Sequence, residues 1–407
     1  MNDVFEALKK YYGYSSFREG QYEIINNILR GRDSFCVLPT GGGKSICYQI
    51  PAVIFKGMTL VISPLIALMK DQVDNLDYSG IPAQYINSTQ SLEEIDNIIL
   101  KCKSGDIKLL YIAPERLENE FFKKQLRRLN ISQIAIDEAH CVSLWGHDFR
   151  KSYREIAPFI NSLRTRPVVT AFTATATEVV REDIIKLLEL RNHYSYIGSF
   201  DRDNLIISVH IEEDKLEFVK DIIRENEENA GIIYCATRKE VDSLYYYLKD
   251  LGYDVGKYHG GLRDDEKVYY QEEFLKENIN VMIATNAFGM GIDKPNVRYI
   301  IHFTIPKNIE SYYQEVGRAG RDGEISKCYL LFNKSDIRTL EYLIYTTASL
   351  NRKEIEISKL QRMIDLCESK ECYRSLVLEY FGEKNIMGYC NSCSNCLKNE
   401  ELRDYTI

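Results

Sequence analysis

The sequence has no apolar run long enough to cross a membrane, and its first ten residues are polar and charged, unlike a signal peptide. We therefore expect a cytoplasmic protein that makes no contact with a membrane. Positive charge is not in excess either: the formal net charge is −8, so any nucleic-acid site must be a local basic groove. The 407 residues, 45% hydrophobic and 28% charged, suit a globular chain of two or three domains.

Disulfide bonds are not indicated, although the chain contains 11 cysteines. Six of them are scattered singly through apolar segments, and we interpret these as buried thiols in a reducing compartment. They are Cys36, Cys47, Cys102, Cys141, Cys235 and Cys328. The other five lie between Cys367 and Cys396, a clustering that indicates a different role.

Short apolar segments alternate with helical patterns along most of the chain, which predicts doubly wound, mostly parallel sheets. The strands predicted in the first half are 34–38, 58–63, 107–112, 132–136 and 167–172. Those predicted in the second half are 230–235, 281–285, 298–303 and 327–332. After about residue 338 the strands cease. We therefore predict an α/β protein with two doubly wound lobes, residues 1–203 and 204–338, followed by a small helical domain, residues 339–407.

The segment LPTGGGKS, residues 38–45, joins a predicted buried strand to a predicted helix. Its glycines can turn sharply and point backbone N–H groups into one concavity, to which the following helix adds its own N–H groups. Lys44 can reach the β- and γ-phosphates of a nucleotide, and the Ser45 hydroxyl can bind Mg²⁺. Leu38 stands where the usual pattern has glycine, and a Gly-rich turn in an ordinary βα unit is the alternative. The candidate phosphate-binding residues are Thr40, Gly41, Gly42, Gly43, Lys44 and Ser45.

An aromatic residue, an arginine and a glutamine precede this loop. An aromatic ring such as that of Tyr14 can stack on a purine, and the Gln21 amide can pair with an adenine edge through one donor and one acceptor. With Arg18, these residues are the candidate base-reading group. The alternative is the ordinary start of a surface helix.

Two acidic residues end another predicted strand. Asp137 and Glu138 follow the apolar run 134–136, and a carboxylate at the C-terminal end of a parallel strand points into the crevice where such sheets bind ligands. We expect Asp137 to hold Mg²⁺ and Glu138 to orient and deprotonate the attacking water; two solvated acids are the alternative. Hydroxyls of the threonine-rich segment 171–177 either connect the hydrolysis site to other groups or merely cap the next helix.

The chain's only tryptophan lies soon after the acidic pair. Residues 141–155 interleave aromatic and basic side chains, which suits stacking on unpaired bases combined with phosphate contacts. A packed loop with the tryptophan in a hydrophobic core is the alternative. The candidate nucleic-acid-contacting and coupling residues are Trp145, His147, Phe149 and Arg150.

In the second half, residues 311–323 carry two arginines three positions apart, and on a helical turn that spacing places them on one face. If they face the phosphate loop of the first half, Arg318 and Arg321 can neutralise charge on the departing γ-phosphoryl group, and Gln314 is a third catalytic candidate. A solvated basic turn is the alternative. Residues 285–293 follow a predicted strand and can offer backbone N–H groups to a nucleic-acid phosphate, although this signal is weak.

The spacing Cys372-x17-Cys390-x2-Cys393-x2-Cys396 has the form of a four-thiolate zinc site, in which close ligands from a knuckle and a distant ligand on a helix complete a tetrahedron. An iron–sulfur cluster also uses four thiolates, but these spacings match neither common pattern. A site without metal is a third alternative, and Cys367 is an alternative ligand in place of Cys372. We expect structural zinc, because no open coordination position is implied.

In this order, the motifs resemble those of a superfamily-two helicase, and specifically those of the RecQ family of DNA helicases, from Tyr14 to Cys396. Residues 14–21, the aromatic-rich loop 143–150 and the cysteines set this family apart. The resemblance implies two RecA-like lobes and a zinc-binding domain, with ATP, Mg²⁺ and Zn²⁺ as cofactors. It also implies 3′→5′ movement on single-stranded and tailed duplex DNA, in replication, recombination or repair.

The resemblance further assigns roles to individual residues. Lys44 and Ser45 bind phosphate and Mg²⁺, Asp137 and Glu138 act on metal and water, Arg318 and Arg321 reach the γ-phosphate across the cleft, and Trp145, Phe149 and Arg150 couple DNA to ATP hydrolysis. Two alternatives stay open: an RNA-directed ATPase, and a zinc-stabilised DNA-binding or annealing protein with a vestigial ATPase. Many family members continue into a winged helix and this chain stops at Ile407, so weak or absent unwinding belongs with the alternatives.

Overall fold

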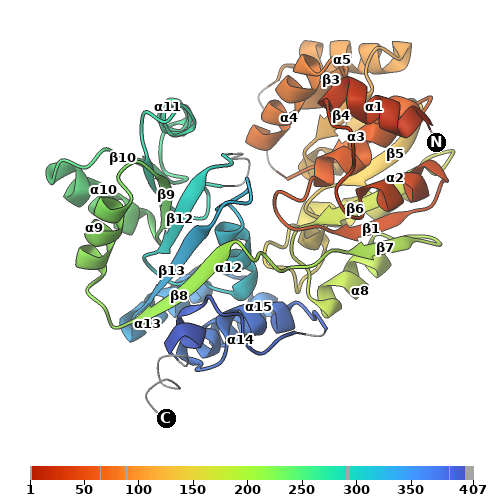
Figure 1. The fold of residues 1–407 in the computed structure, drawn as a ribbon. Coiled ribbons are helices and arrows are strands. Elements are labelled where there is room, and N and C mark those ends of the chain that lie inside the picture. Colours follow the sequence, from red (N-terminus) through yellow and green to blue (C-terminus); the bar gives the residue numbers. More distant parts are fainter. Residues whose placement is uncertain (1, 65, 88–89, 290–293, 385, 399–407) are drawn as a thin grey trace. The chain divides into compact units, whose positions relative to one another are not determined.

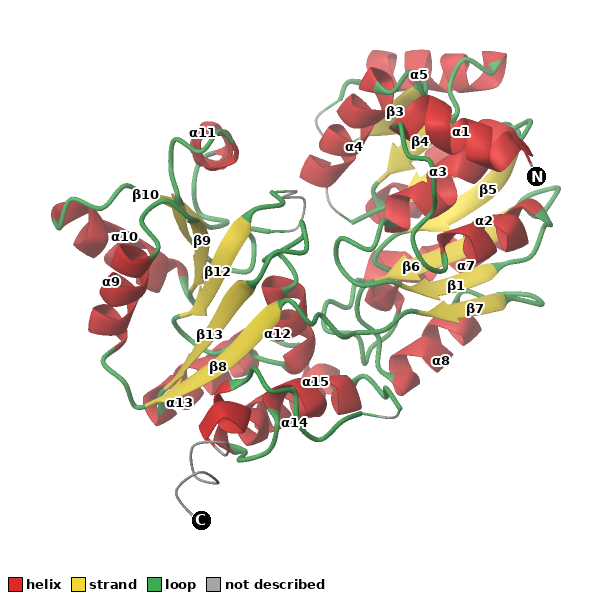
Figure 2. Ribbon diagram, in the orientation of Figure 1, coloured by secondary structure: helices red, strands yellow, loops and turns green. Residues whose placement is uncertain are grey.

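The computed structural model describes residues 2–64, 66–87, 90–289, 294–384 and 386–398. The chain divides into two compact units, Met1–Ser199 and Phe200–Ile407, each built around one sheet (Figure 1). The strand pairings of both sheets are parallel, and helices flank the strands of each unit (Figure 2). The predicted fold class, two parallel-sheet α/β units with a helical C-terminal region, is therefore confirmed.

The first unit contains a seven-stranded sheet in the order β3-β4-β2-β5-β6-β1-β7. Its strands are β1 (Ser34–Val37), β2 (Met58–Ile62), β3 (Ala83–Ile86), β4 (Leu109–Ile112), β5 (Ile131–Ile136), β6 (Val168–Thr173) and β7 (Tyr194–Ile197). Its α-helices are α1 (Asn2–Tyr12), α2 (Gln21–Leu29), α3 (Lys44–Ile54), α4 (Ile66–Tyr78), α5 (Leu92–Ser104), α6 (Glu120–Leu126), α7 (Ile156–Asn161) and α8 (Glu178–Leu187). Three 3₁₀ helices are η1 (Pro114–Glu118), η2 (Ala139–Val142) and η3 (Lys151–Glu155).

The core of this unit lies on both faces of the sheet, as expected for parallel strands covered by helices. β1, β2 and β4 are buried along their whole length. One cluster joins strand residues such as Val61 and Phe172 to α3 and α4, and a second joins α1, α2 and α3 around Ile25 and Ile50. The four scattered cysteines of this unit are all buried, as are the two in the second unit, as predicted. This rigid sheet positions the loops that follow its strands.

The second unit contains a six-stranded sheet in the order β10-β11-β9-β12-β13-β8. Its strands are β8 (Leu205–Ile211), β9 (Ala230–Tyr234), β10 (Val255–Tyr258), β11 (Val281–Ala284), β12 (Val297–His302) and β13 (Ser326–Phe332). Its helices are α9 (Lys215–Glu225), α10 (Arg238–Asp250), α11 (Asp264–Leu275), α12 (Ile309–Val316), α13 (Lys334–Thr347), α14 (Leu350–Glu368) and α15 (Tyr373–Tyr380).

The C-terminal helices pack on this second sheet rather than standing apart from it. α12 contacts both α14 and α15, and α15 also contacts β8. The Lys359 ammonium of α14 lies 2.6 Å from the Glu310 carboxylate of α12, and both side chains are nearly buried. A buried charge must be paired, so this ion pair ties the helical region to the sheet.

Four strands were not predicted: β3, β7, β8 and β10. All four lie at the edges of the two sheets. An edge strand is less completely covered, so its sequence need not be a continuous apolar run. In β7, for example, partly buried residues alternate with exposed ones.

Candidate functional site

The predicted phosphate loop lies between β1 and α3. The Leu38 N–H donates to the Thr173 carbonyl (3.1 Å), and the Gly42 N–H donates to the Pro39 carbonyl (2.9 Å) to form a tight turn. Gly43 then adopts the left-handed region, with φ of 77°, and directly precedes α3. The loop therefore leads into the N-terminus of an 11-residue helix, the arrangement that binds phosphate groups.

A Cβ atom at either of two loop glycines would force neighbouring atoms to shift. A Cβ atom on Gly42 would lie 2.9 Å from the Pro39 carbonyl oxygen, and one on Gly43 would lie 2.3 Å from Nε2 of Gln21. Gly43 would in addition be strained by its positive φ. The glycines are therefore required by the local geometry of the loop.

The candidate base-reading residues contact the phosphate loop itself. Gln21 is 2% exposed; its Oε1 accepts the Arg18 N–H (2.9 Å), and its Nε2 donates to the carbonyls of Gly42 (3.4 Å) and Gly43 (3.2 Å). The Arg18 guanidinium donates to the Gly41 carbonyl. Tyr14, in contrast, is 56% exposed. Arg18 and Gln21 thus support the loop, and contact of this group with a base stays a prediction.

The two side chains that begin α3 lie at the end of the loop. The Lys44 ammonium donates to the Leu38 carbonyl (3.4 Å), and the Ser45 side chain is hydrogen-bonded to that of Tyr48. Lys44, Ser45 and Thr40 are all partly exposed, so solvent reaches this side of the loop. Both candidate ligand groups are therefore accessible from the loop side.

The acidic pair follows β5, as predicted. The Asp137 N–H donates to the Ile62 carbonyl (2.9 Å), and its carboxylate accepts from Ser63 Oγ (3.4 Å) and from the Glu138 N–H (3.0 Å). Burial and, second, the Glu138 carboxylate raise the pKa of Asp137 to about 6, whereas the Lys44 charge opposes the rise. Two fully solvated acids, the alternative interpretation, would not show this shift.

The backbone at Glu138 is strained. Its φ is 47°, a left-handed conformation that non-glycine residues rarely adopt, and it leads directly into η2. Such strain persists only where the surrounding structure holds it, and it is concentrated at functional sites. The Tyr153 hydroxyl, which donates to the Asp137 carbonyl (2.8 Å), is one of the contacts that hold it.

A histidine connects the acidic pair to the threonine-rich segment. The His140 Nδ1 lies 3.2 Å from a Glu138 carboxylate oxygen and 2.9 Å from the Thr173 hydroxyl. The His147 ring stacks on the His140 ring at a centroid distance of 4.0 Å. Thr177 precedes α8 but makes no side-chain cap, so the connecting role fits Thr173 better than the capping role fits Thr177.

The aromatic-rich loop presents its tryptophan to solvent. Trp145 is 48% exposed, so the alternative with Trp145 in a hydrophobic core is wrong. His147 is buried under the loop, and the Arg154 guanidinium lies over the Phe149 ring, 5.8 Å from its centroid. Arg150 donates to the Pro64 carbonyl (3.0 Å), which anchors the loop beside β2. The four candidates lie together, but only Trp145 is well exposed.

The arginine turn, residues 317–323, belongs to the second unit. α12 ends at Val316, so Arg318 and Arg321 follow the helix and do not lie on one helical face as the spacing suggested. Arg318 is 8% exposed, and its guanidinium donates to the Gly289 carbonyl. Gln314 and Arg321 are partly buried, Gln314 within α12. Of the Gly-rich loop 285–293, residues 290–293 lie outside the described residues.

Sequence reasoning missed one set of contacts to this turn. Arg202 and Asn204, at the boundary between the two predicted lobes, donate hydrogen bonds to carbonyls of the turn and of Glu324 beside it. A run of charged and amide side chains directly before a strand was the available signal. That signal was not enough to predict the contacts, because it does not indicate which residues accept the hydrogen bonds, and those of Asn204 lie 116 and 120 positions away.

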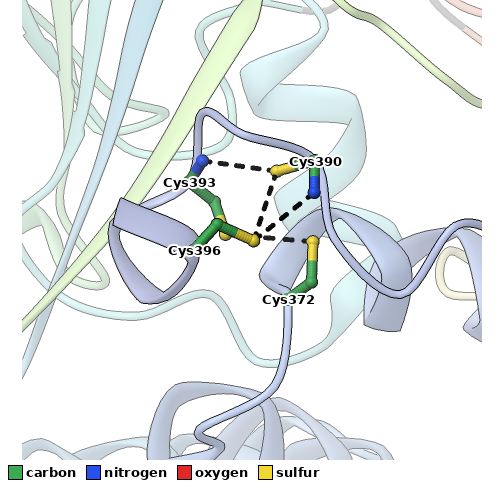
Figure 3. Close-up of side chains that lie close together, drawn as sticks. All are labelled: Cys372, Cys390, Cys393 and Cys396. Carbon is green, nitrogen blue, oxygen red and sulfur yellow. Dashed lines mark hydrogen bonds between the residues drawn. The ribbon is translucent and has the colours of Figure 1, made fainter. Parts of the chain in front are cut away.

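The predicted metal ligands form one cluster, drawn in Figure 3. The sulfur atoms of Cys372, Cys390, Cys393 and Cys396 all lie within 4.8 Å of one another. Two of the separations, Cys372 to Cys393 and Cys390 to Cys396, are 3.9 Å. Four Zn–S bonds of 2.3 Å in a tetrahedron would place the sulfurs ~3.8 Å apart, so the cluster fits zinc. Cys367 is not part of this group, and its role as an alternative ligand is not supported.

The surroundings favour a thiolate at Cys390, whereas burial raises the pKa of the Cys393 and Cys396 thiols. Burial opposes ionisation of Cys390, but hydrogen bonds from the Ser392 hydroxyl and from the N–H groups of Ser392 and Cys393 outweigh it and lower the pKa of that thiol to about 6. Cys372 directly precedes α15 and the other three cysteines lie in a short knuckle, so bound metal would hold the knuckle to the helix.

Three family models match the chain in series. They are a DEAD/DEAH box helicase over residues 18–183, a helicase conserved C-terminal domain over 214–323 and a RecQ zinc-binding domain over 334–397. The first two match the two parallel-sheet units, and together they define a superfamily-two helicase. The third matches the helical region that carries the four cysteines, which supports zinc over an iron–sulfur cluster.

Curated relatives identify the family. The chain is 48% identical over 400 residues to the ATP-dependent DNA helicase RecQ of Bacillus subtilis, covering 98% of this chain and 68% of that protein. It is 42% identical over 394 residues to the RecQ helicase of Haemophilus influenzae, covering 97% of this chain and 63% of that protein. The chain belongs to the RecQ family of helicases, and it is an ATP-hydrolysing enzyme of the helicase class. The resemblance of its motifs to this family is confirmed.

Solved structures agree with the fold. The DUF1998 helicase MrfA, solved bound to DNA, matches with a TM-score of 0.69 and 18% identity over 100% of this chain and 57% of that one. The Saccharomyces cerevisiae protein Dbp5, solved bound to RNA and ADP BeF3, matches with a TM-score of 0.66 and 16% identity over 89% and 97%. In the part of this chain that the structure describes, no helix is both long and apolar enough to cross a membrane.

Proposed function

We propose that the chain is a DNA-dependent ATPase that moves 3′→5′ along single-stranded DNA in the cytoplasm and separates tailed duplexes. One observation carries this proposal. β1 and β5 both pair with β6 in parallel, so the phosphate loop and the acidic pair leave the same edge of one sheet with a single strand between them. That edge is where parallel α/β sheets bind ligands. A nucleotide held by the loop would therefore have the two carboxylates beside its terminal phosphates.

Each residue of this edge has a role that follows from its chemistry. The loop N–H groups and Lys44 hold the phosphates, and Ser45 and Asp137 supply the hard oxygen ligands that Mg²⁺ prefers. Bound Mg²⁺ would neutralise phosphate charge. Glu138 orients the attacking water and accepts its proton, and the contact of its carboxylate with His140 fixes the direction in which it points.

The arginine turn of the second unit supplies the positive charge for the departing phosphoryl group. Arg318 is almost buried, and it forms no ion pair with any residue that the structure describes. Its Nε is buried and has no hydrogen-bond partner among the described residues, and a buried donor of this kind favours an anion as its acceptor. A nucleotide bound to the first unit would provide one, with Gln314 and Arg321 beside Arg318.

Single-stranded DNA binds through its backbone and by stacking on exposed aromatic side chains. Trp145 is available for stacking, and the loop that carries it is joined through the stacked His147 and His140 rings to Glu138 and Thr173. This short path couples DNA on the loop to water activation at the acidic pair. Because most contacts are to phosphate, binding should weaken strongly as the salt concentration rises.

ATP hydrolysis with and without single-stranded DNA tests the proposal. Lys44→Ala and Glu138→Gln should abolish turnover, and Trp145→Ala should lower the stimulation by DNA more than it lowers DNA affinity. Phe121→Ala, which removes another aromatic side chain that is 67% exposed, is the matched control and should leave stimulation unchanged. An unchanged stimulation ratio in Trp145→Ala would reject the coupling role.

The substrate and the polarity need separate measurements. Matched DNA and RNA strands compared as activators of ATP hydrolysis distinguish a DNA helicase from an RNA-directed ATPase. Displacement of a strand from a 3′-tailed duplex, with a 5′-tailed duplex as the control, tests unwinding and direction together. Stimulated hydrolysis without displacement on either duplex would restrict the activity to DNA-dependent ATP hydrolysis.

A further inference from the structure

The segment by which the chain enters the second unit, residues 200–205, holds the arginine turn. The Arg202 guanidinium donates through one nitrogen, Nη2, to the carbonyls of Ala319 (3.0 Å) and Gly320 (2.8 Å). The Asn204 amide donates to the carbonyls of Gly320 (2.9 Å) and Glu324 (2.9 Å). Arg202 Nε also donates to the side-chain oxygen of Asn204, Oδ1 (3.3 Å), so the two side chains act as one unit.

The two residues whose carbonyls accept from Arg202 are the residues that separate the two arginines of the turn. In the order Arg318-Ala319-Gly320-Arg321, fixing the two central carbonyls fixes the directions in which the outer side chains leave the backbone. Gly320 has a φ of 57°, and a Cβ atom there would lie 2.4 Å from the Asn204 Nδ2. The turn is therefore shaped to fit against this segment.

The segment is in turn fixed from α15. The Arg374 guanidinium donates to Asp201 Oδ1 (2.6 Å) and to the carbonyls of Arg202 (2.7 Å), Asp203 (3.3 Å) and Leu205 (2.6 Å). Arg374 lies two positions after the predicted zinc ligand Cys372. A planar guanidinium with five donors in a fixed fork is suited to holding several carbonyls at once.

Aromatic side chains also pack against the segment 200–205. The Phe200 and Phe381 rings stack with their centroids 4.5 Å apart, and the Tyr313 hydroxyl of α12 donates to the Phe200 carbonyl (2.8 Å). Arg202 and Arg374 line one cavity together with Tyr313 and Phe200. Both α12, which precedes the arginine turn, and α15, which follows Cys372, thus contact this short segment.

We propose that Arg202 is a positioning residue for ATP hydrolysis and that it sets the geometry of Arg318 and Arg321. In this proposal, Arg374 holds the segment of Arg202 in place from the zinc-binding module. This inference rests on the proposed role of the arginine turn at the γ-phosphate. The hydrogen bonds of the Arg202 side chain described above go to Asn204 and the arginine turn, so its effect on hydrolysis is exerted through that turn. Its removal leaves the phosphate loop of the first unit intact and displaces the groups that act on the departing phosphoryl.

Steady-state ATP hydrolysis at saturating single-stranded DNA tests the inference in the full chain with zinc bound. Arg202→Gln should lower kcat by about ten- to a hundredfold, the range expected when a group acting on the reacting atoms is misplaced, and leave KM for ATP within about twofold. Arg202→Lys keeps the positive charge and can still donate to one of the carbonyls, so it should recover part of the kcat lost in Arg202→Gln. Arg224→Gln, at an arginine of α9 whose side chain is 54% exposed, is the matched control and should behave as the unchanged protein.

A double-mutant cycle separates positioning from a general loss of order. If Arg202 acts only through the turn, Arg202→Gln should lower kcat little further in protein that already carries Arg318→Ala and Arg321→Ala. A full additional loss in that background would overturn the inference, as would an unchanged kcat in Arg202→Gln. If the Arg318→Ala and Arg321→Ala protein itself keeps its kcat, the proposed role of the turn fails instead.

Two further variants keep the test decisive if Arg202→Gln reduces folding. Asn204→Asp keeps the shape but places an acceptor against two carbonyls, and it should lower kcat with KM unchanged. Arg374→Gln should do the same while the zinc content of the purified protein stays at one equivalent. A loss of kcat in Arg374→Gln only in parallel with a loss of zinc would overturn the part assigned to Arg374.

Discussion

Replacing Gly43 by alanine perturbs the phosphate loop in a way whose size follows from the structure. At a φ of 77° an alanine must adopt the left-handed conformation, which costs about 1–2 kcal/mol. The new Cβ would also lie 2.3 Å from the Gln21 Nε2 and displace it. Gln21 would then lose its bonds to two loop carbonyls, each worth about 0.5–1.5 kcal/mol. We expect Gly43→Ala to destabilise the first unit by about 2–5 kcal/mol in total.

Gly80 offers a matched control in the same unit. Its φ is 78°, and a Cβ atom there would meet nothing within 4 Å. Gly80→Ala should therefore show only the backbone cost of about 1–2 kcal/mol. The difference between the two variants isolates the displacement of Gln21. In protein that carries Gln21→Ala the clash is absent, so the Gly43→Ala cost should fall to that of Gly80→Ala.

Tryptophan fluorescence during urea unfolding is the assay for both variants. The single tryptophan lies at position 145, so its signal reports on the first unit alone and avoids the mixed transition of a chain with two units. Binding of a fluorescent ADP analogue, measured alongside, should weaken in Gly43→Ala and stay unchanged in Gly80→Ala. Equal stability losses in the two variants, to within about 0.5 kcal/mol, would refute the clash with Gln21.

Three further outcomes are expected. Chelation of zinc, or Cys393→Ser, should lower the unfolding midpoint of the second unit and remove one equivalent of metal by elemental analysis, whereas Cys367→Ser should do neither. Thr173→Val should lower kcat and spare ATP affinity, because it removes the hydroxyl that lies 2.9 Å from the His140 Nδ1 and leaves the phosphate loop unchanged; equal loss of both would reject the link. The Arg298 side chain lowers the pKa of Asp322, so this ion pair stabilises the fold above about pH 4 and is lost on acidification. Asp322→Asn should cost under about 1 kcal/mol at pH 7, because the pair is partly exposed, and the gap in urea midpoint should shrink below about pH 4.

The parts of the site that could be predicted from sequence are those whose chemistry is contiguous. Three glycines before Lys44, two acids after an apolar run and a close set of cysteines each carry their signal within a few residues. The buried strands were predicted for the same reason, since β1, β2 and β4 are buried throughout and mostly apolar. Local composition is enough to predict a site or a strand when the residues that form it are neighbours in the sequence.

The parts that could not be predicted depend on contacts between distant residues. Gln21 reaches a glycine 22 positions away, and Arg202 reaches Gly320 across 118 positions. Nothing in the sequence near Arg202 distinguishes a carbonyl-gripping arginine from a solvated one. The prediction that Arg318 and Arg321 lie on one helical face was also wrong. α12 ends before Arg318, because Gly317 caps the helix and the backbone then bends at Gly320.

Arg374 explains why the metal site and the arginine turn belong to one structural unit. Three carbonyls of residues 202–205 and the Asp201 carboxylate are held by this one guanidinium, which also reaches Ser392 in the cysteine knuckle (3.4 Å). A zinc ion with four thiolates would be net negative, so it would add to the Asp201 carboxylate in offsetting the desolvation of the Arg374 guanidinium. If α15 shifted, the donors would leave all four acceptors together, and each carbonyl left unpaired would cost about 1–3 kcal/mol. The segment therefore keeps its shape only while α15 keeps its place, and a metal bound to Cys372 at the start of that helix is what would keep it there.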